Sequence, residues 1–177
     1  YGETYLHGIV GWGPSATSKY LTTYVRRGFV VDDPAAVTAL RGELMYDDGA
    51  VVYLNGTELG RVAMPAGAVT AATLASGNEA NNLYVPFDWS AGKGLLVAGA
   101  NTIAVEVHQA GGTSSDLVFD LALRLDTSAP PPPPPPPPLS VGGVPRGATW
   151  TYWDDGGDQG TAWRTQASPG PGWDTGL

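Results

Sequence analysis

Few side chains in this sequence have the chemistry that catalysis requires. There are two histidines, His7 and His108, and no cysteine. They form no His-x-His or His-Glu-x-x-His pattern, and the sequence has neither a Gly-x-Ser-x-Gly motif nor a glycine-rich phosphate loop with its lysine. His108 falls on the polar side of an alternating segment, where a surface or hydrogen-bonded histidine is more common than a general base. We therefore expect a chain that is not an enzyme.

Clustered aspartates are the next groups that could do chemistry, because they can bind calcium. Calcium takes about six to eight oxygen ligands, which Asp-rich loops with glycine can supply. The best candidates for such a metal site are Asp154, Asp155 and Asp158, which lie around two glycines. Aspartate also closes turns by bonding to its own backbone, and this suffices for Asp47-Asp48-Gly49. The sequence requires no cofactor, and a structural calcium at Asp154, Asp155 and Asp158 remains an alternative to plain turns.

Aromatic side chains in or beside loops could bind carbohydrate by stacking on sugar rings. The residues that fit this description are Tyr5, His7, Trp12, Tyr84 and Trp89. Aromatic rings in an all-β protein lie more often in the core, so each residue alone is weak evidence for a glycan site.

Composition limits the partners that these groups could meet. The chain has 177 residues, 17 acidic and 9 basic, and a formal net charge of -8. A nucleic-acid-binding protein would show a basic stripe, so no nucleic-acid partner is expected. No apolar run approaches the roughly 18 residues that span a bilayer, so the chain is not expected to cross a membrane. The first residue is Tyr1, not Met, which suggests a processed chain or a piece of a longer one.

The elements that would position these side chains are predicted to be strands. Apolar and polar residues alternate in Leu117–Leu125 and Asn101–Gln109, the pattern of half-buried strands. Asn55-Gly56 between two apolar runs predicts a type I′ hairpin turn. Further strands are expected at 20–31, 40–46, 83–89 and 149–153, whereas 66–80 reads as a surface loop. About eight strands at this spacing predict an all-β fold, an antiparallel β-sandwich of jelly-roll type.

A run of nine prolines, Pro130 to Pro138, divides the chain into a body (1–129), a linker (130–138) and a C-terminal arm (139–177). In the polyproline II conformation such a run is a semi-rigid spacer about 28 Å long, and we take Pro130, Pro134 and Pro138 as its markers. The arm is too short to bury a core of its own. It nevertheless contains four of the six tryptophans, so we expect it to dock on a folded partner.

Three stretches of the body resemble the galactose-binding-like jelly-roll modules of secreted multidomain bacterial proteins: Tyr46–Leu59 (YDDGAVVYLNGTEL), Ala63–Gly67 (AMPAG) and Leu95–Gln109 (LLVAGANTIAVEVHQ). The arm sequence Ala148–Arg164 (ATWTYWDDGGDQGTAWR) resembles the opening strand and loop of the same modules. In this chain the order is therefore circularly permuted, with the opening strand at the C-terminus. The resemblance implies an extracellular or cell-surface location.

Permutation leaves the body one strand short, with an apolar groove that must be filled. The arm could fill the groove of its own body, or that of the next copy as in donor-strand exchange, or the chain could be one period of a tandem array. We predict a non-catalytic structural subunit of an extracellular filament, with identical subunits as partners. The arm residues expected to be inserted are Trp150, Tyr152, Trp153 and Trp163. The alternative is a carbohydrate-binding module with glycans as partners.

Overall fold

The structure is a computed structural model that describes residues 10–77, 83–128, 142–165 and 170–176. The predicted spacer, with Pro130, Pro134 and Pro138, and two predicted glycan-site residues, Tyr5 and His7, lie outside the described residues. Within them, no helix is long and apolar enough to cross a bilayer.

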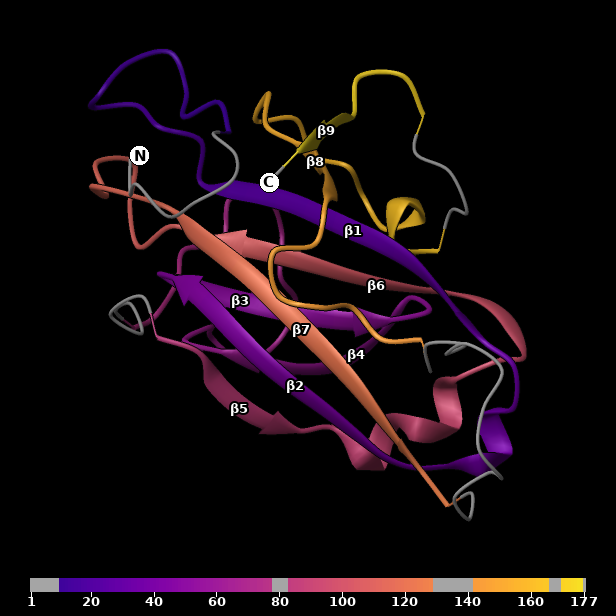
Figure 1. The fold of residues 1–177 in the computed structure, drawn as a ribbon. Helices are drawn as coiled ribbons and strands as arrows, with labels where there is room; N and C mark the ends of the chain where they lie inside the picture. Colours follow the sequence, from indigo (N-terminus) through magenta and orange to yellow (C-terminus); the bar gives the residue numbers. More distant parts are fainter. Residues whose placement is uncertain (1–9, 78–82, 129–141, 166–169, 177) are drawn as a thin grey trace.

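Two antiparallel sheets pack face to face as a β-sandwich, which confirms the predicted fold class (Figure 1). The larger sheet has the order β4-β3-β6-β1-β8-β9 and the smaller one β5-β2-β7. The strands are β1 (Thr22–Val31), β2 (Val37–Asp47), β3 (Gly49–Leu54), β4 (Thr57–Val62), β5 (Val85–Asp88), β6 (Gly99–His108), β7 (Val118–Thr127), β8 (Trp150–Trp153) and β9 (Asp174–Gly176). The described residues also form the short 3-10 helices η1 (Pro34–Ala36), η2 (Ser90–Leu95) and η3 (Ala162–Arg164).

The β3–β4 hairpin forms at the predicted turn. Asn55 and Gly56 both have positive φ angles, 49° and 84°, as the type I′ turn requires. The Asn55 side chain also bonds to the neighbouring segment, accepting from the Thr102 N–H at 2.8 Å and donating to Leu95 O at 2.9 Å. Sequence preference and tertiary contacts therefore agree at this turn.

The main core lies between the two sheets, and one of the predicted glycan-binding rings is part of it. Trp89 is 6% exposed and stacks on Phe87 at 5.4 Å between ring centroids. A Cβ on Gly42 would lie 2.1 Å from the Trp89 ring, so the glycine on β2 makes the space that the ring occupies. Trp89 is thus a core residue here and presents no platform to solvent.

A second, smaller cluster covers the outer face of the larger sheet. It contains Tyr24, Val51, Tyr53, Met64, Ala104 and Trp163. Because this cluster covers the outer side of β6, Glu106 and His108 are buried as well, although their alternation with Val105 and Val107 places them on the opposite face from the main core. The larger sheet is therefore buried on both of its faces at its centre.

Candidate functional site: the arm interface

The arm, described here for residues 142–165 and 170–176, adds a strand to the larger sheet of its own body. β8 pairs antiparallel with β1, and Val25 lies opposite Tyr152. β9 then pairs with β8 and ends the sheet. The predicted arm strand therefore forms, at the edge of β1 that β6 leaves open (Figure 1).

Before it reaches β8, the arm closes the side of the sandwich between the two sheets. Val144 and Leu123 exchange two backbone hydrogen bonds, at 3.0 and 2.9 Å. A Cβ on Gly142 would lie 2.4 Å from Val30 O, and one on Gly143 would lie 2.0 Å from Leu123 O. Only glycine permits these two close approaches, so this segment is fitted to the space between β1 and β7.

On the inner face of β8, Trp150 enters the main core. It is 2% exposed and meets Phe119 of β7 edge-on, with ring centroids 5.0 Å apart. Tyr152 packs against the same core and is half-buried. The arm thus supplies one large buried side chain to the space between the sheets.

On the outer face, Trp163 of η3 covers the tyrosines of the larger sheet. Its ring lies 4.9 Å from that of Tyr24 and 6.4 Å from that of Tyr53, both edge-on, and it is 2% exposed. Trp173 lies 6.0 Å from Trp163 and 5.9 Å from Trp153, so three tryptophans of the arm form one group. The arm therefore holds β1 from both faces.

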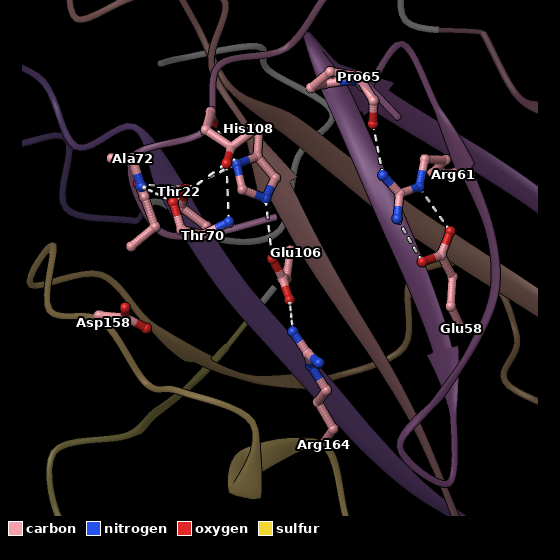
Figure 2. Close-up of polar contacts among 12 residues, drawn as sticks. Thr22, Glu58, Arg61, Pro65, Thr70, Ala72, Glu106, His108, Asp158 and Arg164 are labelled. Atoms are coloured by element: carbon pink, nitrogen blue, oxygen red, sulfur yellow. Dashed lines mark hydrogen bonds and ion pairs between the residues drawn. The ribbon is translucent and has the colours of Figure 1, made fainter. Parts of the chain in front are cut away.

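Next to Trp163, the arm forms an ion pair with a carboxylate buried in the sheet (Figure 2). Arg164 Nη2 bonds to Glu106 Oε1, and the guanidinium carbon lies 4.0 Å from the centre of the Tyr53 ring. Burial by itself would raise the pKa of Glu106, but the hydrogen bonds from His108 and Arg164 outweigh it and hold that pKa below its ordinary value. The charged carboxylate is therefore the form that this site stabilises.

His108 holds the other oxygen of Glu106 from inside the sheet (Figure 2). Its Nε2 lies 3.1 Å from Glu106 Oε2, and its Nδ1 lies 2.8 Å from Thr73 O and 2.9 Å from Thr22 Oγ1. Because the Thr22 hydroxyl donates to Ala71 O, its oxygen can only accept from the ring. Both ring nitrogens of His108 therefore lie within hydrogen-bond distance of oxygen atoms of neighbouring residues.

At the rim of the arm interface, Arg146 contacts the smaller sheet. It pairs with Glu43 at 2.9 Å, and its guanidinium lies 3.9 Å from the centre of the Tyr84 ring. The Tyr84 hydroxyl donates to Asp120, which also accepts from the Gly147 N–H at 3.2 Å. Tyr84, predicted as a glycan-binding residue, therefore lies at the arm interface.

The predicted glycan residues that the structure describes do not form one platform. Trp12 is 40% exposed, and the Lys19 ammonium lies 5.9 Å from its ring centre. Tyr84 lies under Arg146, and Trp89 is in the core. The three rings have different surroundings.

The three predicted calcium ligands act as separate acceptors. Asp154 accepts from Gly11 N, Asp155 from Gly157 N at 2.7 Å and from the Trp153 indole, and Asp158 from Gly160 N at 2.8 Å. Among the described residues, no three His, Cys, Asp or Glu side chains come together in a way that could hold a metal ion. The turn interpretation accounts for Asp155 and Asp158, whose partners lie two residues ahead.

Sequence reasoning did not find Glu106, Tyr24 and Tyr53 as part of this interface. One feature of the sequence could have indicated Glu106: it is the one carboxylate in β6, and it lies between the apolar Val105 and Val107. A carboxylate in such a strand is rarely buried without a partner. Its partner is 58 residues away in the sequence, so the pairing could not be read from local pattern.

Comparisons with protein-family models and with curated proteins give no match. Among solved structures, the fold is similar to part of the Streptomyces avermitilis alpha-L-rhamnosidase that was crystallised in complex with L-rhamnose, with a TM-score of 0.57 and 19% sequence identity. The match covers 94% of this chain and 14% of that enzyme. At this identity the likeness supports the β-sandwich fold alone, and the chain spans only a small part of the enzyme's length.

Proposed function

We propose that this protein is a non-catalytic structural subunit of an extracellular filament, in which the arm of one copy completes the body of the next. The observation that carries the proposal is the arm interface. It combines an added strand, an inserted Trp150, a two-glycine contact and a buried ion pair. These are the contacts of a docked partner segment, because the arm reaches the body covalently only through residues 129–141. The sequence resemblance to galactose-binding-like modules in permuted order supports the same interpretation.

Exchange between copies would preserve every contact of the arm interface, because an exchanged element makes the same contacts with the neighbouring body as with its own. The arm and the surface that receives it are different parts of the chain. Such a head-to-tail contact gives an open fibre unless the rotation between copies closes a ring. A filament is therefore the natural product of exchange here.

The connection favours exchange over closure on the same body. Val144 lies opposite Leu123 in an antiparallel bridge, which puts Gly142 about three residues, or about 10 Å, from Ser128. Nine prolines in polyproline II conformation would extend about 28 Å. Closure on the same body then requires the four flanking residues to run back along the proline segment, whereas a neighbouring body can be reached without reversal.

A pair of engineered cysteines distinguishes the two arrangements, because the chain has no cysteine of its own. Arg26 on β1 lies directly opposite Thr151 on β8. Opposed residues of an antiparallel pair are about 4.5 to 5.5 Å apart, within the range for a disulfide. The variant Arg26→Cys/Thr151→Cys is oxidised at increasing protein concentration and run on a non-reducing gel.

Exchange predicts a ladder of covalent oligomers from the double variant, with filaments of the unmodified chain in negative-stain electron micrographs. Each single variant is the matched control, since one cysteine per chain can give dimers only. A double variant that stays a monomer without free thiols at every concentration would overturn the filament proposal, because its arms would then close on their own bodies.

Carbohydrate binding is the second candidate, and a groove across the smaller sheet favours it. The groove has a volume of about 880 Å³, and its lining includes Arg41, Glu43, Phe87, Arg124 and Arg146. Planar charged side chains beside an aromatic ring can bind sugar hydroxyls, and the similar fold belongs to an enzyme crystallised with L-rhamnose. This candidate predicts that a glycan array detects binding by the monomer, and that Arg146→Ala abolishes it. An array without binding would remove this candidate.

A further inference from the structure

The surface that η3 covers has the features of a binding pocket for a guanidinium group. Glu106 and the Tyr53 ring both contact the Arg164 guanidinium, one as a charge-assisted acceptor and the other through its face. The Glu106 side chain is 2% exposed, and the residues opposite it on the two flanking strands are Val51 of β3 and Tyr24 of β1. A carboxylate so placed is costly to leave without a cation.

The orientation of the Glu106 carboxylate is fixed by residues of the body. His108 binds Oε2 of Glu106, Tyr53 also forms a hydrogen bond with this carboxylate, and Arg164 binds Oε1 from the arm side. His108 is itself held by Thr22 (Figure 2). It also bonds to the Thr73 carbonyl, so it acts as a positioning residue. The pocket is therefore preorganised by the body before any arm residue enters it.

We propose that Glu106 and Tyr53 form a guanidinium pocket that selects which arms can dock. Its occupant is Arg164 of an arm, and an arm without a guanidinium at this position docks weakly. A lysine has no planar guanidinium to stack on the Tyr53 ring, which lies 4.0 Å from the Arg164 guanidinium carbon, and therefore fits the pocket less well. The pocket itself is filled by the chain's own arm in this structure, but its role in choosing a partner copy rests on the proposed function.

The test is a double-mutant cycle in the full chain. Hydrogen exchange of the β8 amides, followed by mass spectrometry, reports how often the arm opens. Arg164→Met and Glu106→Gln are each expected to lower β8 protection by roughly 10- to 100-fold, the effect of losing a hydrogen bond to a charged group. The double variant Glu106→Gln/Arg164→Met should keep at least the β8 protection of the less protected single variant. The β8 protection of Arg164→Lys should lie between that of the original chain and that of Arg164→Met.

Two controls keep the result interpretable. Lys93→Met removes an exposed cation of η2 whose ammonium donates to Thr38 O at 3.3 Å, so it should leave β8 protection unchanged. Protection of the amides of β2, which pairs only with the body strands β5 and β7, reports whether the body is folded. If Glu106→Gln does not fold, the comparison of Arg164→Lys with Arg164→Met still tests the pocket, because both changes lie on the arm.

Two results would overturn the pocket: losses that simply multiply in the double variant, or an Arg164→Met arm that docks as well as the original. Neither result depends on whether the arm docks on its own body or on a neighbour. The cysteine experiment answers that separate question, so a coupled cycle with only monomers would keep the pocket and remove the filament.

Discussion

Replacing Trp163 by alanine tests how much of the arm interface depends on the outer face of the larger sheet. Trp163 is 2% exposed and contacts both Tyr24 and Tyr53. A buried aromatic ring of this size covers about 150 to 250 Å². At about 25 cal/mol per Å² this is about 4 to 6 kcal/mol, an upper estimate.

Part of that area lies against Trp173, which belongs to the arm itself and moves with it. Subtracting this part, and allowing for the 3 to 5 kcal/mol that is typical of aromatic-to-alanine changes, we expect a loss of about 3 kcal/mol in arm docking. This corresponds to a docking constant reduced by more than about 100-fold.

The assay compares hydrogen exchange in β8 with that in β2, which pairs only with body strands, and light scattering reports the mass of assemblies. Trp163→Ala should lose protection in β8 while β2 stays protected. Adding Trp153→Ala should abolish polymers and leave a folded body. Val97→Ala is the control, because Val97 is an apolar residue that is 50% exposed and whose backbone bonds to Asn101 of the body. Unchanged β8 protection in Trp163→Ala, or undiminished polymers in the double variant, would refute this account of arm docking.

Three further outcomes are expected. Gly143→Val should detach the arm, since a Cβ at this position would lie 2.0 Å from Leu123 O, and faster β8 exchange with unchanged exchange in β2 would verify this. The lowered pKa of Glu106 means that its contribution is present above its unfolded value, about 4.3, and is lost as the pH falls through the folded value. The original chain should therefore lose more stability in acid melts than Glu106→Gln does, and parallel curves would contradict the assignment. A chelator should leave the melting temperature unchanged, because Asp155 and Asp158 bond to backbone N–H groups two residues ahead; a drop would restore the calcium hypothesis.

Local pattern was sufficient for much of the fold. The alternation around Val105 placed the inner face of β6 correctly, and Asn55-Gly56 located the β3–β4 turn. Both depend on contacts within a few residues or on one face of one strand. The position of Trp89 was not readable in the same way, because the space for its ring is made by Gly42, on a strand that is 47 residues earlier in the sequence.

The arm interface was predictable in part. The composition of the arm showed that it must dock, and the structure places both Trp150 and Trp163 in buried contacts with the body. The sequence could not show that the arm would pack on both faces of β1, nor that Arg164 would form an ion pair with a carboxylate on β6. These pairings depend on the order of strands in the sheet, which no local periodicity encodes.

The positions of the two arm connections have a consequence for the shape of a fibre. The incoming arm enters beside Val30, at the end of β1, and the outgoing chain leaves β7 near η1, where Ser128 bonds to Ala36 at 3.0 Å. Both connections are thus at one end of the sandwich. In a fibre, each body would be joined to its neighbours at this end only. The length of the predicted proline spacer, and not the width of the body, would then set the distance between successive bodies along the fibre. The opposite end, with the loops at 10–21 and 109–117, would point away from the spacer in every subunit. A fibre would therefore present these loops at regular intervals, as sites to which other molecules could be attached.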